Sequence, residues 1–274
     1  MNFSTKQYEV RRCNGETQSA EKDYLVVEEP LEIRVNGHPL GVVMRTPGHE
    51  PELARGFVLS EGILPLHEIY EHLAALTIEA ARDEMGLEIP NVINVSVPKL
   101  ALAPLLAARR QMVATASCGI CGRASLEHVR QQALPLRSGF ACALTILHRL
   151  AERIAAQQTA FAKTGGLHAA ALFNRNGEIL FVREDIGRHN AVDKVIGAAL
   201  LARAYPLADC GLWVSGRLSF EMAQKALLAG IPCVVAVSAA SSLAVDLARQ
   251  TGMTLVGFLR KEQAVIYCGA KNLS

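Results

Sequence analysis

The fold is set by residues 212–258, LWVSGRLSFEMAQKALLAGIPCVVAVSAASSLAVDLARQTGMTLVGF. Short apolar runs at LWVS, CVVAV and TLVGF have the length of buried strands, and the segments 219–229 and 241–250 between them are typical of helices. Strands that alternate with helices in this way build layered sheets. The stretch therefore predicts an α/β sandwich.

The residues before this stretch extend the same pattern. AAALF and EILFVR bracket a turn at Asn174–Gly177, a helix is expected over 189–203, and LTILHRLAERIAAQQ has the spacing of an amphipathic helix. We therefore expect a C-terminal domain over residues 136–274 with a mixed sheet between layers of helices.

The first half of the chain predicts a smaller α+β domain over residues 24–114. LEIRV and PLGVVM flank Asn36-Gly37, a dipeptide that favours a tight hairpin turn. A helix is expected in PELARGFVLSEGIL, followed by a strand in NVINVSV. Residues 1–23 are polar without a clear period and are expected to form a loose arm, and residues 115–135 are expected to form a cysteine loop and a linker helix.

Composition excludes several classes of protein. The 274 residues carry 28 basic and 26 acidic side chains, a net charge of +2, so no broad basic surface for nucleic acid is expected. No uninterrupted apolar stretch is long enough for a membrane helix, and the N-terminus lacks the apolar core of a secretory signal. We expect a cytoplasmic protein with reduced thiols.

Cys118 and Cys121 form a CxxC pair in SCGICGR, the strongest chemical signal in the chain. Arg123 and the start of the expected helix favour thiolate over thiol, which makes a nucleophile at neutral pH. Three functions are compatible with this spacing: half of a zinc site, a thiol-disulfide redox pair, and a sulfur carrier that holds a persulfide. Zinc is not expected, because the chain has no second CxxC, CxxH or HxxxH.

Several motifs occur together in the order of a known family. These are EEPLEIRVNG, RTPG with ELARGFVLSEG, SCGICG, TGGLHAAALF, EDIGRHNAVDKVIG, SGRLSFEMAQKAL and LAVDLARQTGMTLVGFLR. As a set they resemble the FdhD family, sulfur-carrier proteins needed for formate dehydrogenase activity. The resemblance runs from about residue 28 to residue 260.

The resemblance implies a sulfurtransferase. Sulfur would pass from a cysteine desulfurase to a persulfide on Cys118, with Cys121 assisting, and then to Mo-bis(molybdopterin guanine dinucleotide) before that cofactor enters formate dehydrogenase. It also implies a homodimer and a cytidine deaminase-like C-terminal domain. Two alternatives stay open: a molybdenum-cofactor-binding chaperone without sulfur transfer, and a CxxC thiol-disulfide oxidoreductase.

The same resemblance places cofactor contacts just beyond the last strand of the opening stretch. The residues it implies there are Phe258, Leu259, Arg260, Lys261, Glu262 and Gln263. Arginine and lysine suit phosphate groups at such a site.

A second set of phosphate contacts is expected at two helix starts, whose amide groups attract anions. The candidate residues are Arg188, His189, Ser215 and Arg217. The zinc ligands of a deaminase are missing at both places, so deamination is not expected. An alternative is that Asp185 and Ser219 cap helices while Arg188 and Arg217 form surface or interdomain ion pairs.

Overall fold

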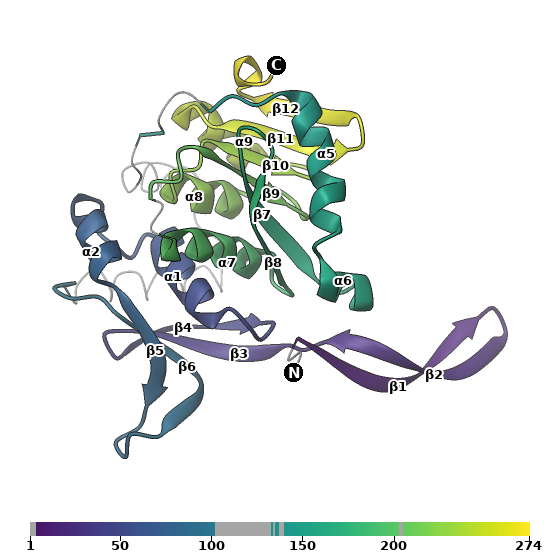
Figure 1. The fold of residues 1–274 in the computed structure, drawn as a ribbon, viewed down its shortest axis with the longest axis horizontal. Helices are drawn as coiled ribbons and strands as arrows, with labels where there is room; N and C mark the ends of the chain where they lie inside the picture. Colours follow the sequence, from purple (N-terminus) through teal and green to yellow (C-terminus); the bar gives the residue numbers. More distant parts are fainter. Residues whose placement is uncertain (1–3, 102–132, 134, 137–139, 203–204) are drawn as a thin grey trace.

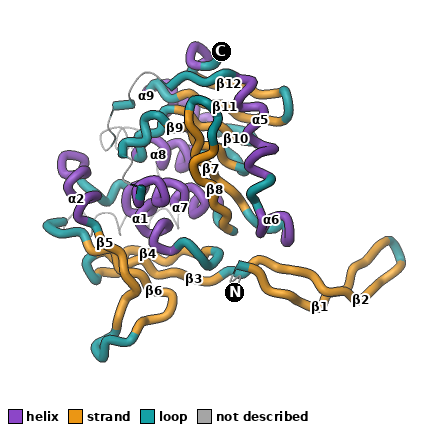
Figure 2. Tube along the Cα trace, viewed as in Figure 1, coloured by secondary structure: helices purple, strands orange, loops and turns teal. Residues whose placement is uncertain are grey.

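The computed structural model of this chain describes residues 4–101, 133, 135–136, 140–202 and 205–274. Its described strands form three sheets, of two, six and four strands. The six-stranded sheet lies at the centre of the larger body, with the four-stranded sheet below it in Figure 1. Figure 2 shows the two-stranded sheet extending away from both.

The larger body is built on a mixed sheet, as predicted. Its elements are α5 (Leu144–Ala155), α6 (Thr159–Thr164), β7 (His168–Asn174), β8 (Ile179–Asp185), α7 (Arg188–Leu201), β9 (Cys210–Val214), α8 (Phe220–Leu228), β10 (Cys233–Ala236), α9 (Ser242–Thr251), β11 (Thr254–Arg260), β12 (Gln263–Cys268) and η2 (Ala270–Asn272). The strand order is β12-β11-β10-β9-β7-β8. Strands β9, β10 and β11 are parallel, whereas β7 and β12 run antiparallel to their neighbours.

Both faces of this sheet are covered by helices. Helices α7, α8 and α9 lie on one side and α5 lies on the other (Figure 1). Because side chains alternate along a strand, β7 serves two cores: Ala171 and Phe173 pack in the cluster with α5, while Ala170 and Leu172 pack in the cluster with α7 and α8. Burial on both faces explains why these strands are continuous apolar runs in the sequence.

The smaller unit packs two helices with a four-stranded sheet. Its elements are β3 (Glu29–Val35), β4 (His38–Arg45), α1 (Glu50–Ser60), η1 (Leu66–Glu68), α2 (Ile69–Ala75), β5 (Thr77–Arg82) and β6 (Glu88–Ser96). The strand order is β4-β3-β6-β5. The predicted Asn36-Gly37 turn is present, with both residues at positive φ, and the Asn36 side chain bonds the backbone of Val97 in both directions at 2.7 and 2.9 Å.

The two units meet where helix α1 crosses helix α7. Two glycines allow the backbones to touch: a Cβ on Gly56 would lie 1.9 Å from the carbonyl oxygen of Asp193, and one on Gly197 would lie 1.8 Å from that of Glu52. One hydrophobic cluster runs from the smaller sheet through this crossing to the larger sheet. The units predicted as separate domains therefore share a core.

A buried ion cluster joins α1, α7 and α8 beside this crossing. The ammonium group of Lys225 donates to Ser60 at 2.9 Å, to Glu61 at 2.6 Å and to Asp193 at 2.9 Å. Burial alone would lower the pKa of Lys225, but the carboxylates of Asp193 and Glu61 outweigh it and raise that pKa. Removing one partner of such a buried pair costs about 3–5 kcal/mol.

The N-terminal segment differs from the expected loose arm. It forms a hairpin of β1 (Thr5–Asn14) and β2 (Thr17–Val26), paired antiparallel over their full length. Most of its side chains are exposed. Neither strand needs an apolar face, so the sequence lacks the alternation of apolar and polar residues that marks a half-buried strand. This explains why the sequence did not predict the hairpin.

The cysteine loop and linker helix expected over 115–135 lie almost wholly outside the described residues. The sequence also did not predict β5, β12, α2 and α6, which are short or largely exposed. No helix in the described part of the chain is long and apolar enough to cross a bilayer.

Candidate functional site

The predicted cofactor residues of the described chain gather at one edge of the six-stranded sheet. Strands β8, β9, β10 and β11 all point the same way, so their carboxyl ends meet at this edge. Helices α7, α8 and α9 begin there. In open α/β sheets, ligands bind in the crevice outside the carboxyl ends of the strands.

The starts of α7 and α8 form one polar cluster at this edge. His189 at the start of α7 pairs with Glu221 in the first turn of α8, with Nε2 and Oε2 2.9 Å apart. Ser215, which follows β9, accepts a hydrogen bond from the backbone of Ala169 at 2.9 Å, and its Oγ lies 3.4 Å from His168 Nδ1. We call these residues, together with Arg188, the helix-start cluster.

Two arginines near these helix starts, Arg188 and Arg217, form no ion pair within the described chain. Burial, with Arg188 and His189 nearby, lowers the pKa of His168, so its imidazole is neutral at neutral pH. The buried Nε of Arg188 has no hydrogen-bond partner among the described residues. Arg217 is exposed and makes no ion pair within the described chain. The cations Arg188 and Arg217 are thus available to a ligand.

The turn between β11 and β12 forms the other part of the predicted site. Phe258 and Lys261 have positive φ angles of 51° and 48°, and the Phe258 amide donates to the carbonyl of Ser238 at 3.1 Å. Leu259 between them is only 1 % exposed and packs in the core under α5. Its side chain anchors the turn and does not face a ligand, whereas Phe258 is 40 % exposed.

A groove of about 790 Å³ runs between this turn and helix α5. Its lining residues are Thr145, His148, Arg149, Glu152, Arg260, Lys261, Glu262 and Gln263. Four of the six residues predicted in this segment therefore line one groove. The groove has the size of a small-molecule site.

The structure separates the predicted cofactor residues into two sets. The groove is lined by residues of the β11–β12 turn and of α5, and none of Arg188, His189, Ser215 and Arg217 lines it. Both sets lie at the same edge of the sheet. The four residues of α5 were not predicted, although their spacing marks the polar face of an amphipathic helix.

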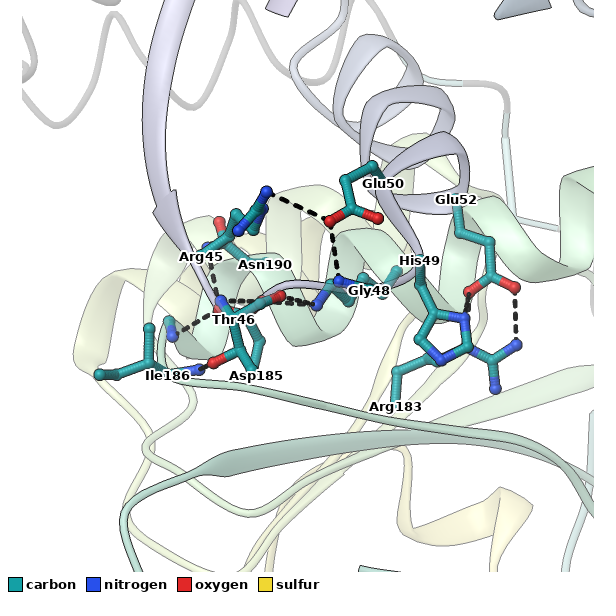
Figure 3. Close-up of polar contacts among 12 residues, drawn as sticks. Arg45, Thr46, Gly48, His49, Glu50, Glu52, Arg183, Asp185, Ile186 and Asn190 are labelled. Carbon is teal, nitrogen blue, oxygen red and sulfur yellow. Dashed lines mark hydrogen bonds and ion pairs between the residues drawn. The ribbon is translucent and has the colours of Figure 1, made fainter. Parts of the chain in front are cut away.

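The loop before α7 is held by a buried network that the sequence did not reveal (Figure 3). The backbone amide of Thr46 donates to Asp185 at 3.1 Å, and its hydroxyl accepts from the amide of Ile186 at 3.1 Å. Lys194 pairs with Asp185 at 2.7 Å and donates to the carbonyl of Thr46 at 2.9 Å. Asn190 donates to Asp185 at 3.0 Å.

This network fixes the position of Arg188 and His189. Asp185 and Lys194 are both almost fully buried, with 0 % and 1 % of their side chains exposed. The Asp185 carboxylate also accepts from the amide of Gly187 at 2.8 Å, so the turn that leads into α7 is held at several points. Asp185 therefore positions this turn but does not cap α7, whose N-cap residue is Gly187 and which has no side-chain cap.

A second ionic contact joins the two units beside the network. Arg183 on β8 contacts both carboxylate oxygens of Glu52 on α1, at 2.5 and 2.7 Å, and His49 lies 3.3 Å from the same carboxylate (Figure 3). Burial would raise the pKa of Glu52, but the hydrogen bonds from Arg183 and His49 lower it to about 2. Glu52 is therefore ionised throughout the physiological range.

The predicted catalytic residues Cys118 and Cys121 lie outside the described residues. Among the described thiols, burial raises the pKa of Cys142 and of Cys210 to about 11 each, and it also raises that of Cys233. These three are poor nucleophiles at neutral pH. Within the described ranges, no group of three or more His, Cys, Asp or Glu side chains is placed to hold a metal ion.

Comparisons with known proteins agree over nearly the whole chain. A family model described as the FdhD/NarQ family matches residues 26–274. A protein named sulfur carrier protein FdhD from Streptomyces coelicolor is 46% identical over 276 residues, covering 98% of this chain and 96% of that protein. A relative of the same name from Mycobacterium tuberculosis is 44% identical over 276 residues, covering 100% of both chains.

The fold also has a solved counterpart. A crystal structure named as a formate dehydrogenase accessory protein from Desulfotalea psychrophila superimposes with a TM-score of 0.75 at 22% identity, covering 98% of this chain and 99% of that chain. With the motifs and the family model in agreement, this chain belongs to the FdhD/NarQ family.

Proposed function

We propose that this protein is a sulfurtransferase that carries sulfur as a persulfide on Cys118 and delivers it to a molybdenum cofactor. The observation that carries the proposal is the likeness, at 44% to 46% identity over nearly the whole chain, to proteins named sulfur carrier protein. The CxxC pair supplies a nucleophile suited to that role.

The loading step needs only a thiolate and a persulfide donor. The Cys118 thiolate attacks the terminal sulfur of a persulfide on a cysteine desulfurase, a new S–S bond forms, and the desulfurase cysteine leaves as a thiolate. No external oxidant or reductant is required. In this scheme Cys121 assists release of the sulfur to the acceptor.

The acceptor proposed is Mo-bis(molybdopterin guanine dinucleotide), bound as substrate at the carboxyl edge of the sheet. The groove between α5 and the β11–β12 turn has the size for a nucleotide, and Arg260 and Lys261 supply cations for its phosphates. The helix-start cluster adds Arg188, whose buried Nε has no partner in the described residues. The residues present fit a large anionic ligand.

The wider setting follows from the same family. We propose a cytoplasmic homodimer whose larger body has the layering of a cytidine deaminase, with a cysteine desulfurase as sulfur donor and formate dehydrogenase as client. The relative from Desulfotalea psychrophila carries the name of a formate dehydrogenase accessory protein, which supports that client.

Mass spectrometry of the intact protein tests the sulfur-carrier function. After incubation with a cysteine desulfurase and cysteine, the protein should gain the mass of one sulfur atom, and the Cys118→Ala variant should not. Cys13→Ala is the matched control, because Cys13 is an exposed thiol on the hairpin. The control should load as the wild type does.

The outcome also separates the alternatives. A Cys118→Ala variant that still restores formate dehydrogenase activity would favour a cofactor-binding chaperone. Thiol-disulfide exchange that depends on both cysteines, without sulfur loading, would favour an oxidoreductase.

A further inference from the structure

Helix α5 presents a regular polar face to the groove. Thr145, His148, Arg149 and Glu152 follow the spacing i, i+3, i+4 and i+7, which places them along one side of a helix. The other side of α5 buries Leu147, Leu150 and Ile154 against the sheet. Because that apolar side is fully buried, the polar face is held at a fixed angle to the groove.

The charged side chains of the groove are not neutralised within the protein. None of the five charged residues that line it forms an ion pair with another described residue: Arg149, Glu152, Arg260, Lys261 and Glu262. Arg149 and Glu152 lie three residues apart on α5, a spacing at which opposite charges often pair on a helix. The Nε2 atom of His148 is buried and also lacks a hydrogen-bond partner in the described chain. The groove thus offers free donors and free acceptors together.

A ligand that matches both signs needs anionic groups and a group with paired hydrogen-bond donors. Phosphates satisfy arginine and lysine. A carboxylate accepts two hydrogen bonds from adjacent donors, and guanine presents such a pair in its N1–H and its exocyclic amine. Adenine has an acceptor at N1, which would face a carboxylate unfavourably.

We propose that Glu152 is the residue by which the groove selects guanine, with Arg149 contacting the phosphates. The inference rests on the proposed function, in which the groove binds a guanine-containing cofactor. It goes beyond that function because it assigns base selection to one carboxylate of α5.

The position of Glu152 favours it over Glu262, the other carboxylate in the groove. Glu152 lies on a helix whose opposite side is buried, and a base-reading group must be held rigidly to discriminate. Glu262 lies in the turn between β11 and β12, beside Lys261 with its positive φ. Both are exposed and unpaired in the described chain, so Glu262→Gln is a matched control for Glu152→Gln.

Calorimetric titration of the full-length protein with GDP, IDP and ADP tests the inference. Wild type should bind GDP more tightly than ADP, with IDP between them because hypoxanthine keeps N1–H but lacks the amine. Glu152→Gln should weaken GDP binding about tenfold and remove most of the preference over ADP, since one charged hydrogen bond is worth about that factor. Glu262→Gln, which changes the other carboxylate of the groove, should keep the ratio of GDP affinity to ADP affinity even if it lowers both affinities.

The Arg260→Ala variant distinguishes failure of the Glu152 assignment from failure of the proposed cofactor site. If GDP binds, Arg260→Ala weakens it, and Glu152→Gln keeps the full preference for GDP, the assignment of Glu152 is wrong while the groove remains a nucleotide site. If wild type does not bind GDP, or Arg260→Ala binds it unchanged, the cofactor site and the inference both fail. Glu152 has no described partner, so its variant is expected to keep the wild-type unfolding temperature.

Discussion

Glu52 shows how a single carboxylate can make stability depend on pH. Its contacts with Arg183 and His49 lower its pKa from 4.5 to about 2. A group whose pKa is lowered by folding contributes stability that is complete above its unfolded pKa. That contribution is lost as the pH falls from 4.5 toward about 2.

We expect Glu52→Gln to destabilise the protein near neutral pH and to match the wild type more closely as the pH approaches about 3. Urea unfolding of both proteins across that range measures the difference in the free energy of unfolding. Glu88→Gln is the control, because its ion pair with Arg82 is exposed and is worth less than about 1 kcal/mol at any pH. A difference that stayed constant on acidification would contradict the assigned pKa.

The buried network around Asp185 illustrates why parts of the site escaped the sequence. Asp185 and Thr46 are separated by 139 positions along the chain, and no local pattern relates them. The motifs RTPG and EDIGRHN both carry the family resemblance, but only the structure shows that hydrogen bonds join one motif to the other.

At the scale of elements, the crossing of α1 and α7 depends on two residues without side chains. Replacing a glycine by alanine within an exposed helix normally raises the free energy of unfolding by about 1 kcal/mol. Gly197 should behave in the opposite way, because its Cβ would lie 1.8 Å from the Glu52 carbonyl oxygen, a backbone atom.

We expect Gly197→Ala to lower the free energy of unfolding by about 2 kcal/mol or more, since the helices must separate to admit the methyl group. Chemical denaturation measures this loss. The control is Gly166→Ala, where the nearest atoms lie 3.9 Å from the new Cβ and little change is expected. An unchanged midpoint for Gly197→Ala would mean that the helices pack less closely than described.

Elements were predictable from the sequence where burial imposes a period. The strands β7, β9, β10 and β11 and the helices α5, α7, α8 and α9 were all expected, because apolar runs and helical spacing mark them. The sequence predicts residues 258–263 as a ligand site, but it does not show that the Leu259 side chain is buried while that of Phe258 is exposed. Strand alternation alone does not say which residue of a twisted turn faces the core.

At the scale of the whole molecule, the β1–β2 hairpin projects from the rest and meets it where β2 contacts α6. It contributes no residue to either hydrophobic cluster, and the family model begins at residue 26, where the hairpin ends. Opposite charges on β1 and β2 pair across the hairpin, as Arg12 does with Glu21.

A chain that begins at Val27 should therefore unfold at nearly the same temperature as the full chain. The physical reason is that two exposed strands without a core add little stability of their own. Calorimetric unfolding of the two chains gives the comparison. A large drop in the unfolding temperature, or loss of a single cooperative transition, would show that the hairpin supports the core.

The close contact at Gly56 and Gly197 also limits how this protein can diverge. Since backbone meets backbone there, neither helix can change its path unless the other moves with it. Recombination that brought in a first half from a distant relative would have to bring a compatible α7 with it. The two helices are for this reason expected to be inherited as a single unit.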